Sequence, residues 1–299
     1  MMKIVHDTGE NELARVFVAE LEDGSNIEFV ESVQPPYSWR EKWVLIVSTL
    51  KGCPVGCPIC DAGSAYRGKL TRDEILAQIE HLVLSRFPDG AATMPKLKIQ
   101  FARMGDPAFN PAVLEVLEML PGRFSLPGLM PSISSVAPVG RERFFEDLLR
   151  IKEELYPGGR FQLQFSVHTT DEQAKRTLVP VRTWSLEQTA EFGDRFFETG
   201  DRKITLNFAA ARGLPLEPKK LASLFSKDRF LVKLTPINPT KAAIQSGLES
   251  LIDPADEDAC QTVAESFRAE GFETILSIGD LRENAIGSNC GMYVTRMAG

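Results

Sequence analysis

The chain has 299 residues, of which 43% are hydrophobic and 25% charged, and its formal net charge is −7. This composition is ordinary for a soluble globular protein and allows one α/β barrel or two modest domains. The sequence pI of about 5.2 argues against broad affinity for nucleic-acid phosphates, which needs clustered Lys and Arg. No apolar run reaches the ~18 residues that span a bilayer, and the N-terminal segment lacks a signal-peptide core. We therefore expect a cytoplasmic protein with no membrane partner.

The N-terminal part of the chain reads as a small β-rich lead-in. Residues 15–33 alternate apolar and polar side chains around the turn-forming Asp23-Gly24-Ser25, a pattern that predicts a β-hairpin. The continuous apolar run at 43–49 is typical of a buried parallel strand. We expect a lead-in over residues 1–40 and a barrel with a C-terminal cysteine-bearing segment over 41–299.

From residue 43 onward, strands and helices are predicted to alternate. Further strands are expected at 96–102, 131–136, 161–167, 203–209, 229–236 and 273–279, and helices at 71–87, near 110–120, at 141–156, 185–200, near 217–226 and at 259–272. Six β-then-α units in series predict parallel strands joined by right-handed crossovers. Because a full barrel has eight units, the expected fold is a partial (β/α)6 TIM-like barrel of the α/β class. Its chemistry should gather at the C-terminal ends of the strands.

A cysteine-rich loop directly follows the strand predicted at 43–49. Cys53, Cys57 and Cys60 have the spacing C-x3-C-x2-C, and thiolates this dense in one loop indicate metal ligands. A structural zinc site would need a fourth ligand. The candidates for that ligand are His6, His81, His168, Cys260 and Cys290. Three cysteines leave one iron of a 4Fe–4S cluster open to a ligand that is not protein. A zinc site and a purely structural cluster remain the alternatives.

The cysteine spacing resembles the signature of the radical S-adenosylmethionine (SAM) enzymes. In them the open iron binds the amino and carboxylate groups of SAM, and an electron cleaves SAM to methionine and a 5′-deoxyadenosyl radical. The chain over residues 28–292 resembles one subgroup, the ribosomal-RNA adenine methyltransferases of the RlmN/Cfr type. This resemblance implies a 4Fe–4S cluster, SAM, and an electron donor such as flavodoxin or ferredoxin.

Four segments at predicted strand ends resemble SAM-binding motifs of that subgroup. They are FARMGDPAFN (101–110), SISSVAP (132–138), FSVHTTDEQAKRTLVPV (165–181) and LTPINP (234–239). The resemblance implies that SAM is bound by Gly105, Asp106, Ser134, Ser166, Val167, His168 and Asn238. Taken without the resemblance, these residues read as a turn, a helix cap, a core histidine and a turn asparagine.

Two further residues are implied in the chemistry itself. LRENAIGSNCGM (281–292) resembles the segment whose cysteine accepts a methyl group from one SAM, which makes Cys290 the candidate methyl carrier. A radical from a second SAM then activates that methyl group for attack on an aromatic carbon. VESVQPP (30–36) resembles the segment whose glutamate takes the proton of the substrate, which points to Glu31. Otherwise, Cys290 is a buried small hydrophobe and Glu31 a solvent-facing strand residue.

The chain also departs from the subgroup at several positions. The resolving cysteine is replaced by Ile46, an aromatic residue by Ile59 and a glutamate by Asn207, and the N-terminal RNA-binding helical extension has no counterpart. We therefore expect methylation, or a related alkylation, of an unactivated carbon in a small molecule or peptide rather than in RNA. The alternatives are a radical SAM enzyme with a different outcome and an RNA methyltransferase-like protein acting on ribosomal or transfer RNA.

Overall fold

A single ten-stranded sheet organises the chain in the computed structural model, which describes residues 2–33, 36–64, 66–288 and 293–294. Its strand order is β1-β2-β3-β4-β7-β8-β9-β10-β11-β12. In chain order the strands are β1 (Lys3–Glu10), β2 (Ala14–Glu20), β3 (Asn26–Val33), β4 (Lys42–Val47), β7 (Lys96–Phe101), β8 (Leu129–Ser135), β9 (Gln162–Ser166), β10 (Ile204–Ala209), β11 (Phe230–Thr235) and β12 (Thr274–Leu276). The pairs from β4 to β12 are parallel, and those from β1 to β4 are antiparallel. The predicted α/β partial TIM-like barrel is confirmed.

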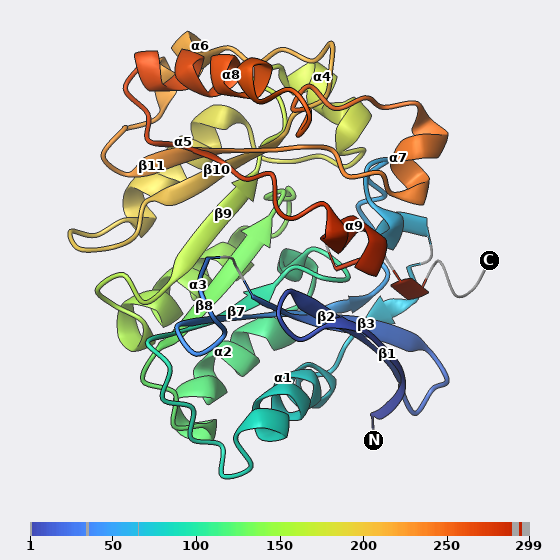
Figure 1. Cartoon of the computed structure of the whole chain (residues 1–299). Helices are drawn as coiled ribbons and strands as arrows, with labels where there is room; N and C mark the ends of the chain where they lie inside the picture. The colour runs from blue at the N-terminus through green and yellow to red at the C-terminus, as the bar shows by residue number, and fades with distance from the viewer. Residues whose placement is uncertain (1, 34–35, 65, 289–292, 295–299) are drawn as a thin grey trace.

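Helices cover the outer face of this sheet, as Figure 1 shows. They are α1 (Arg72–Arg86), α2 (Ala112–Arg123), α3 (Glu142–Leu155), α4 (Glu172–Leu178), α5 (Leu186–Phe196), α6 (Pro218–Leu224), α7 (Lys241–Ser246), α8 (Glu257–Ala269) and α9 (Arg282–Ile286). The predicted capping box at the start of α1 is present, with Thr71 and Glu74 each bonded to the other's backbone N–H. Helices α4, α7 and α9 were not predicted. No helix among the described residues is long and apolar enough to cross a membrane.

The two faces of each parallel strand differ in character. On β7, Leu97, Ile99 and Phe101 are fully buried in the main core, beneath the helices. Because side chains alternate along a strand, Lys96, Lys98 and Gln100 point to the opposite, concave face. These three are only partly buried. The interior of the partial barrel is therefore polar, while the apolar core lies between sheet and helices.

The N-terminal strands extend the barrel sheet directly, through the antiparallel pairing of β3 with β4. Strand β1 was not predicted. The concave face of β2 and β3 contributes Val16 and Val30 to a small apolar cluster, which Ile286 of α9 and Tyr293 help to cover. Tyr293 also stacks on His6 of β1, with ring centroids 5.0 Å apart. Segments from both ends of the chain thus meet on the same side of the molecule (Figure 1).

Candidate functional site

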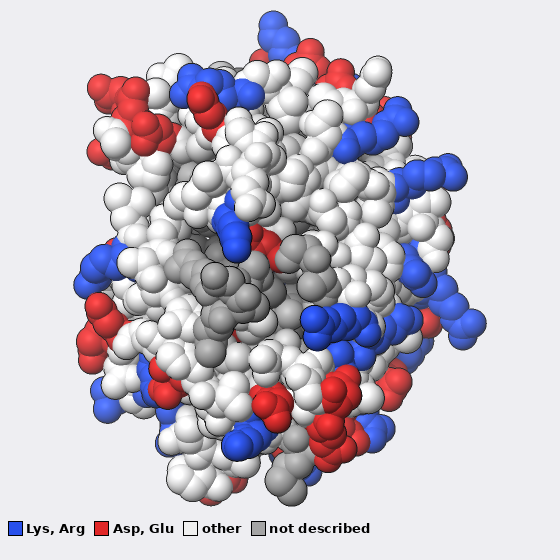
Figure 2. Space-filling model, turned by 90° about the vertical axis from the view of Figure 1, so that its right-hand side faces the viewer, with Lys and Arg blue, Asp and Glu red and all other residues white. Residues whose placement is uncertain are grey.

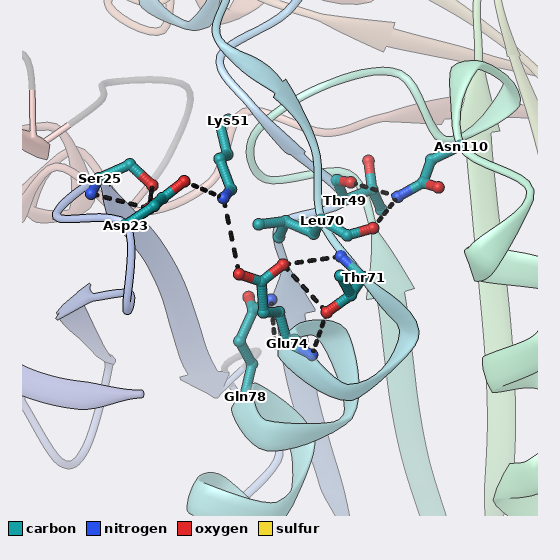
Figure 3. A network of polar contacts seen from close by, with 9 residues as sticks. All are labelled: Asp23, Ser25, Thr49, Lys51, Leu70, Thr71, Glu74, Gln78 and Asn110. Atoms are coloured by element: carbon teal, nitrogen blue, oxygen red, sulfur yellow. Dashed lines mark hydrogen bonds and ion pairs between the residues drawn. The ribbon is translucent and has the colours of Figure 1, made fainter. Parts of the chain in front are cut away.

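The cysteine loop leaves the C-terminal end of β4 and is held firmly at its root. Lys51 is the register partner of Gly68 in the short antiparallel pair of β5 (Leu50–Lys51) and β6 (Gly68–Lys69). Figure 3 shows its ammonium group between two carboxylates, those of Asp23 and of Glu74 at the start of α1. Inside the loop, Gly56 has a φ of +71°, a conformation that glycine adopts without strain. These contacts hold the backbone in place two residues before Cys53.

The three thiols lie close enough to influence one another. Burial raises the pKa of Cys57 well above its usual range, and the neighbouring Cys60 and Cys53 thiolates and Asp106 raise it further. Burial likewise raises the pKa of Cys53, opposed by backbone N–H groups of Val55, Asp106 and Gly56. These N–H groups donate hydrogen bonds to the Cys53 sulfur and so favour its thiolate form. A cation that neutralises the thiolates would remove this penalty, because metal binding requires deprotonated cysteines.

The donor set fits an iron–sulfur cluster better than a lone ion. Among residues 2–33, 36–64, 66–288 and 293–294, no three His, Cys, Asp or Glu side chains converge as ligands of a single metal ion. Thiolates of a cluster bind different irons, so they need not converge on one point. Cys53, Cys57 and Cys60 are free thiols, and Cys53 and Cys57 pack against an apolar cluster that includes Val55 and Leu178. A wall of this kind limits water at the sulfurs, and solvent access is one control on cluster potential.

The 101–110 segment braces the cysteine loop from the adjacent strand β7. The carbonyl of Met104 accepts hydrogen bonds from the backbone N–H groups of Thr49 and Leu50, both 2.9 Å long. At the far end of the segment, the Asn110 amide donates to the carbonyls of Thr49 and Leu70, each at 2.7 Å (Figure 3). Between them Gly105 has a φ of +91°, and a Cβ there would lie 2.4 Å from the Leu50 side chain. Gly105 thus permits close approach of two loops.

Asp106 ties the ends of β7 and β8 together. Its carboxylate accepts hydrogen bonds from the Ser135 hydroxyl at 2.9 and 3.0 Å, and from the backbone N–H groups of Val136 at 2.7 Å and Ala108 at 2.9 Å. Burial raises its pKa to about 6, and these hydrogen bonds oppose the rise. Most acceptor positions of the carboxylate are filled. An incoming amino group of SAM would have to displace the Ser135 hydroxyl, the one donor that is not backbone.

The remaining predicted SAM residues lie at the ends of three other parallel strands. Ser134 is the second-last residue of β8, and Ser166 is the last residue of β9. Val167 and His168 directly follow β9, and Asn238 lies in the loop after β11. The backbone N–H groups of Val167 and His168 both donate to the carbonyl of Asn207 on β10. Parallel strands present these ends at one edge of the sheet, the edge that carries the cysteine loop. The structure therefore gathers them on one side, as expected.

His168 is held in an unusual conformation. Its φ is +66°, in the left-handed region that non-glycine residues seldom adopt. Its ring Nδ1 accepts a hydrogen bond from the Ala209 N–H at 3.1 Å, which puts the ring proton on Nε2. Burial lowers the pKa of His168 to about 3, with a smaller contribution from Lys175. The imidazole is neutral at physiological pH.

Helix α7 closes over the cysteine loop from the β11 side. The Asp61 carboxylate accepts hydrogen bonds from the N–H groups of Lys241 and Ala242 in the first turn of α7. The hydroxyl of Thr240 donates to the carbonyl of Ile59 at 3.2 Å. Ile59 stands where the RlmN/Cfr subgroup has an aromatic residue, and its backbone carbonyl links the cysteine loop to α7.

Glu31 does not face the same side as the C-terminal segment. Its carboxylate binds the Arg86 guanidinium at 2.9 Å and the Trp43 indole N–H at 3.1 Å, both on the α1 side of the sheet. It is buried, so it is not the solvent-facing residue of the simpler prediction. Glu28, three residues earlier on β3, points to the opposite, concave face because strand side chains alternate.

Glu28 and Arg103 form a buried ion pair that holds the C-terminal segment. Their side chains approach to 2.6 Å and are 0% and 5% exposed. Arg103 donates to the carbonyls of Gly287 at 2.5 Å and Ser288 at 2.8 Å, and the other Glu28 oxygen accepts from the Val294 N–H at 2.8 Å. Cys290 lies outside the described residues. The pair binds the chain on both sides of residues 289–292.

Ile46 lies on the same concave surface. It is the register partner of Val30, and like Ile286 and Tyr293 it packs against the apolar cluster that contains Val16 and Val30. The position at which the RlmN/Cfr subgroup has its resolving cysteine therefore borders the same cluster as Ile286 and Tyr293.

Similarity to known proteins extends over nearly the whole chain. No protein-family model matches the chain. A protein of Streptomyces griseus described as a probable dual-specificity RNA methyltransferase RlmN is 26% identical over 96% of this chain and 75% of its own length. One of Desulfitobacterium hafniense with the same description is 27% identical over 93% of this chain and 74% of its length. A crystal structure of a radical SAM methyltransferase from Sphaerobacter thermophilus superposes with a TM-score of 0.74 at 21% identity, over 97% of this chain and 80% of that one.

The chain thus resembles RlmN-type radical SAM methyltransferases over nearly its whole length. These comparisons support a methyltransferase-like radical SAM enzyme, and Cys53, Cys57 and Cys60 fit a 4Fe–4S cluster with SAM as the second cofactor. The assignment of individual residues to those cofactors rests on the geometry above and is taken up as a proposal below.

Sequence reasoning about this RlmN/Cfr-like protein missed several residues of the site. Ser135 holds Asp106, and Glu28 and Arg103 hold the C-terminal segment. Lys175 of α4 is buried near Cys57 and His168, and its burial lowers its pKa to about 8. Arg103 lies within the 101–110 motif, and an arginine just after a buried strand could have marked it. Nothing local marks Glu28 or Lys175.

Proposed function

We propose that this protein is a cytoplasmic radical SAM enzyme that methylates, or otherwise alkylates, an unactivated carbon of a small molecule or peptide through Cys290. The proposal rests on the shared fold, the RlmN-like sequence and the arrangement at the C-terminal edge of the sheet. Its cytoplasmic location suits free thiols and an oxygen-sensitive cluster.

Three thiols of the loop after β4 would hold the cluster. Cys53, Cys57 and Cys60 supply three ligands and leave a fourth position for SAM. When bound, cluster and SAM supply the one-electron chemistry that generates a carbon radical. Gly105, Asp106, Ser134, Ser166, Val167, His168 and Asn238 are the residues proposed to line the SAM pocket. They come from the same edge, so one ligand could contact several of them.

The observation that carries the proposal is the buried Glu28–Arg103 pair. It holds residues 287–288 and 294, which flank Cys290 in the sequence, against the concave face beside the 101–106 segment. Of the two β3 carboxylates, Glu28 faces this segment and Glu31 is bonded to Arg86 and Trp43. Glu28 therefore replaces Glu31 as our candidate for the proton acceptor.

The test is mass spectrometry of protein reconstituted without oxygen. With SAM and a reductant, we expect 5′-deoxyadenosine and a +14 Da adduct on the Cys290 peptide. The Cys290→Ala variant should still cleave SAM but give no methylated product, whereas Cys260→Ala, which changes a buried thiol on α8, should behave as wild type. An unmodified Cys290 peptide after SAM cleavage would favour the non-methylating alternative. Failure to bind iron would refute the proposal as a whole.

RNA is the second candidate substrate, because both relatives are described as RNA methyltransferases. The net charge of −7 gives this candidate less support. Figure 2, which looks onto the side with α7 and α9, shows basic side chains along its right-hand margin and acidic and basic ones mixed elsewhere. Binding of RNA backbones depends on clustered positive charge and weakens steeply with salt. Tight, salt-sensitive binding of a short RNA and its methylation would establish RNA as the substrate instead.

A further inference from the structure

Positive side chains gather inside the barrel, below the edge that carries the cysteine loop. Lys42 and Lys96 are register partners at the start of β4 and β7, and Lys98 follows on the same face of β7. Lys233 of β11 is the register partner of Asn207 and Ile275. Since the outward neighbours of these lysines are buried under helices, the lysines themselves point into the concave interior.

The electrostatics place these groups within reach of one another. The pKa of Lys98 lies well below its usual range because of burial and of the charges on Lys233, Lys42, Lys96 and Arg202. Burial, Arg202 and Lys42 lower the pKa of Lys96 to about 8. No carboxylate contributes to either shift. Lys98 is still partly exposed, so it lines a space rather than packing in a solid core.

Nearby carboxylates are already committed to other cations. Asp201 binds the Lys152 ammonium at 2.5 Å and accepts from the Glu198 N–H at 3.0 Å. Glu273 pairs with Lys203 at 3.4 Å, and Glu28 on the concave face pairs with Arg103. Within the described ranges, Lys96, Lys98 and Arg202 form no ion pair with a carboxylate of the chain. Burial of these three like charges close together costs stability, and a bound anion would offset that cost.

Arg202 of this cluster lines a cavity at the N-terminal ends of the last strands. Its volume is about 460 Å³, and its lining also includes Lys203 and the carboxylates Asp201 and Glu273. That volume lies in the range of small-molecule sites. Lys98 is three residues before the end of β7, about 10 Å below the cysteine-loop edge at ~3.3 Å per residue. A molecule with an anionic group at Lys98 could thus extend to the edge.

We propose that the barrel interior binds a phosphate or pyrophosphate group of a small-molecule substrate, with Lys96 and Lys98 as its main contacts and Lys42, Lys233 and Arg202 around it. This inference narrows the substrate class of the proposed function and rests on it for the substrate's role. The binding itself depends only on the lysine cluster. It is therefore tested separately from the radical chemistry.

The test is calorimetric titration of the reconstituted full chain with inorganic pyrophosphate. We expect saturable binding of one pyrophosphate, at least tenfold weaker in Lys98→Met and unchanged in Lys219→Met, which alters an exposed lysine on α6. Without anion, Lys98→Met should melt no lower than wild type, because it removes a charge from a like-charge cluster. Pyrophosphate should raise the melting temperature of wild type and Lys219→Met equally, and that of Lys98→Met less.

Two results would overturn the proposal that Lys98 binds an anion. One is the absence of saturable binding, or equal binding by wild type and Lys98→Met. The other is a lower melting temperature of Lys98→Met without anion, which would mean that Lys98 already has a counter-charge. Displacement of pyrophosphate by a ten-nucleotide RNA would overturn the small-molecule assignment. Normal 5′-deoxyadenosine formation without anion binding would refute this inference alone, and anion binding without SAM cleavage would refute only the proposed function.

Discussion

The buried pair of Glu28 and Arg103 allows stability and positioning to be separated by mutation. Arg103→Met would leave the Glu28 carboxylate, 0% exposed, with the Val294 N–H as its remaining hydrogen-bond donor among those described above. Removing one partner of a buried ion pair costs about 3–5 kcal/mol. That is a large part of the 5–15 kcal/mol by which a typical domain is stable. Urea denaturation of the apoprotein should therefore show a loss of about this size.

The double variant Glu28→Leu/Arg103→Met should behave differently. Replacing both charges by apolar side chains of similar volume is often neutral or stabilising, so global stability should return to within about 1 kcal/mol of wild type. The three hydrogen bonds to Gly287, Ser288 and Val294 remain lost. At about 1 kcal/mol each, their loss should raise local opening of this segment about 100-fold.

Hydrogen exchange with mass spectrometry measures this opening directly. A peptide covering 281–294 should exchange about 100-fold faster in the double variant, while peptides of β8 and β9 keep their wild-type rates. The Glu31→Gln variant is the matched control, since it changes a buried carboxylate on the other face of β3. A loss below about 1 kcal/mol in Arg103→Met, or wild-type exchange of 281–294 in the double variant, would show that the pair does not hold this segment.

Three other predictions follow from the site. Gly105→Ala should lose about 2 kcal/mol more than Gly140→Ala in denaturation, because both have positive φ but only a Cβ at Gly105 meets Leu50; equal losses would contradict this. For His168, the pKa lowered to about 3 means that the unfolded state binds more protons below pH 6.5, so stability falls as pH falls. Between pH 7 and 5, wild type should lose about 2 kcal/mol more than His168→Asn, a residue that tolerates the left-handed backbone, and parallel pH profiles would refute the buried neutral imidazole. Ile46→Cys should make turnover independent of added thiol, measured as product formed with and without dithiothreitol; continued dependence would argue against an internal disulfide.

The barrel could be predicted because its signals are local. Strand β7 is marked by its apolar residues, and helix α1 by its helical spacing and the capping box of Thr71 and Glu74. Helices α4, α7 and α9 have five to seven residues each, too few for a periodic pattern. The cysteine loop and the strand-end motifs were found because spacing alone marks them.

The orientation of β3 could not be read from the sequence. The alternation in NIEFVESV breaks at Phe29-Val30 and the strand is buried on both faces, so the pattern does not distinguish the face of Glu28 from that of Glu31. The register with β4 and the side chains across it decide the matter. The same holds for Lys96 and Lys98. In an open sheet their alternation would mean a solvated face, and only the curvature of the barrel turns that face inward.

The contact between β1 and Tyr293 has a consequence for synthesis of the protein on the ribosome. His6 and Tyr293 are 287 positions apart, so the contact between β1 and Tyr293 can form only after residue 293 has been synthesised. Until then, Val16 and Val30 lack the cover of Ile286 and Tyr293. The apolar surface around Val16 and Val30 is therefore open to chaperones until residues 286–293 have been synthesised.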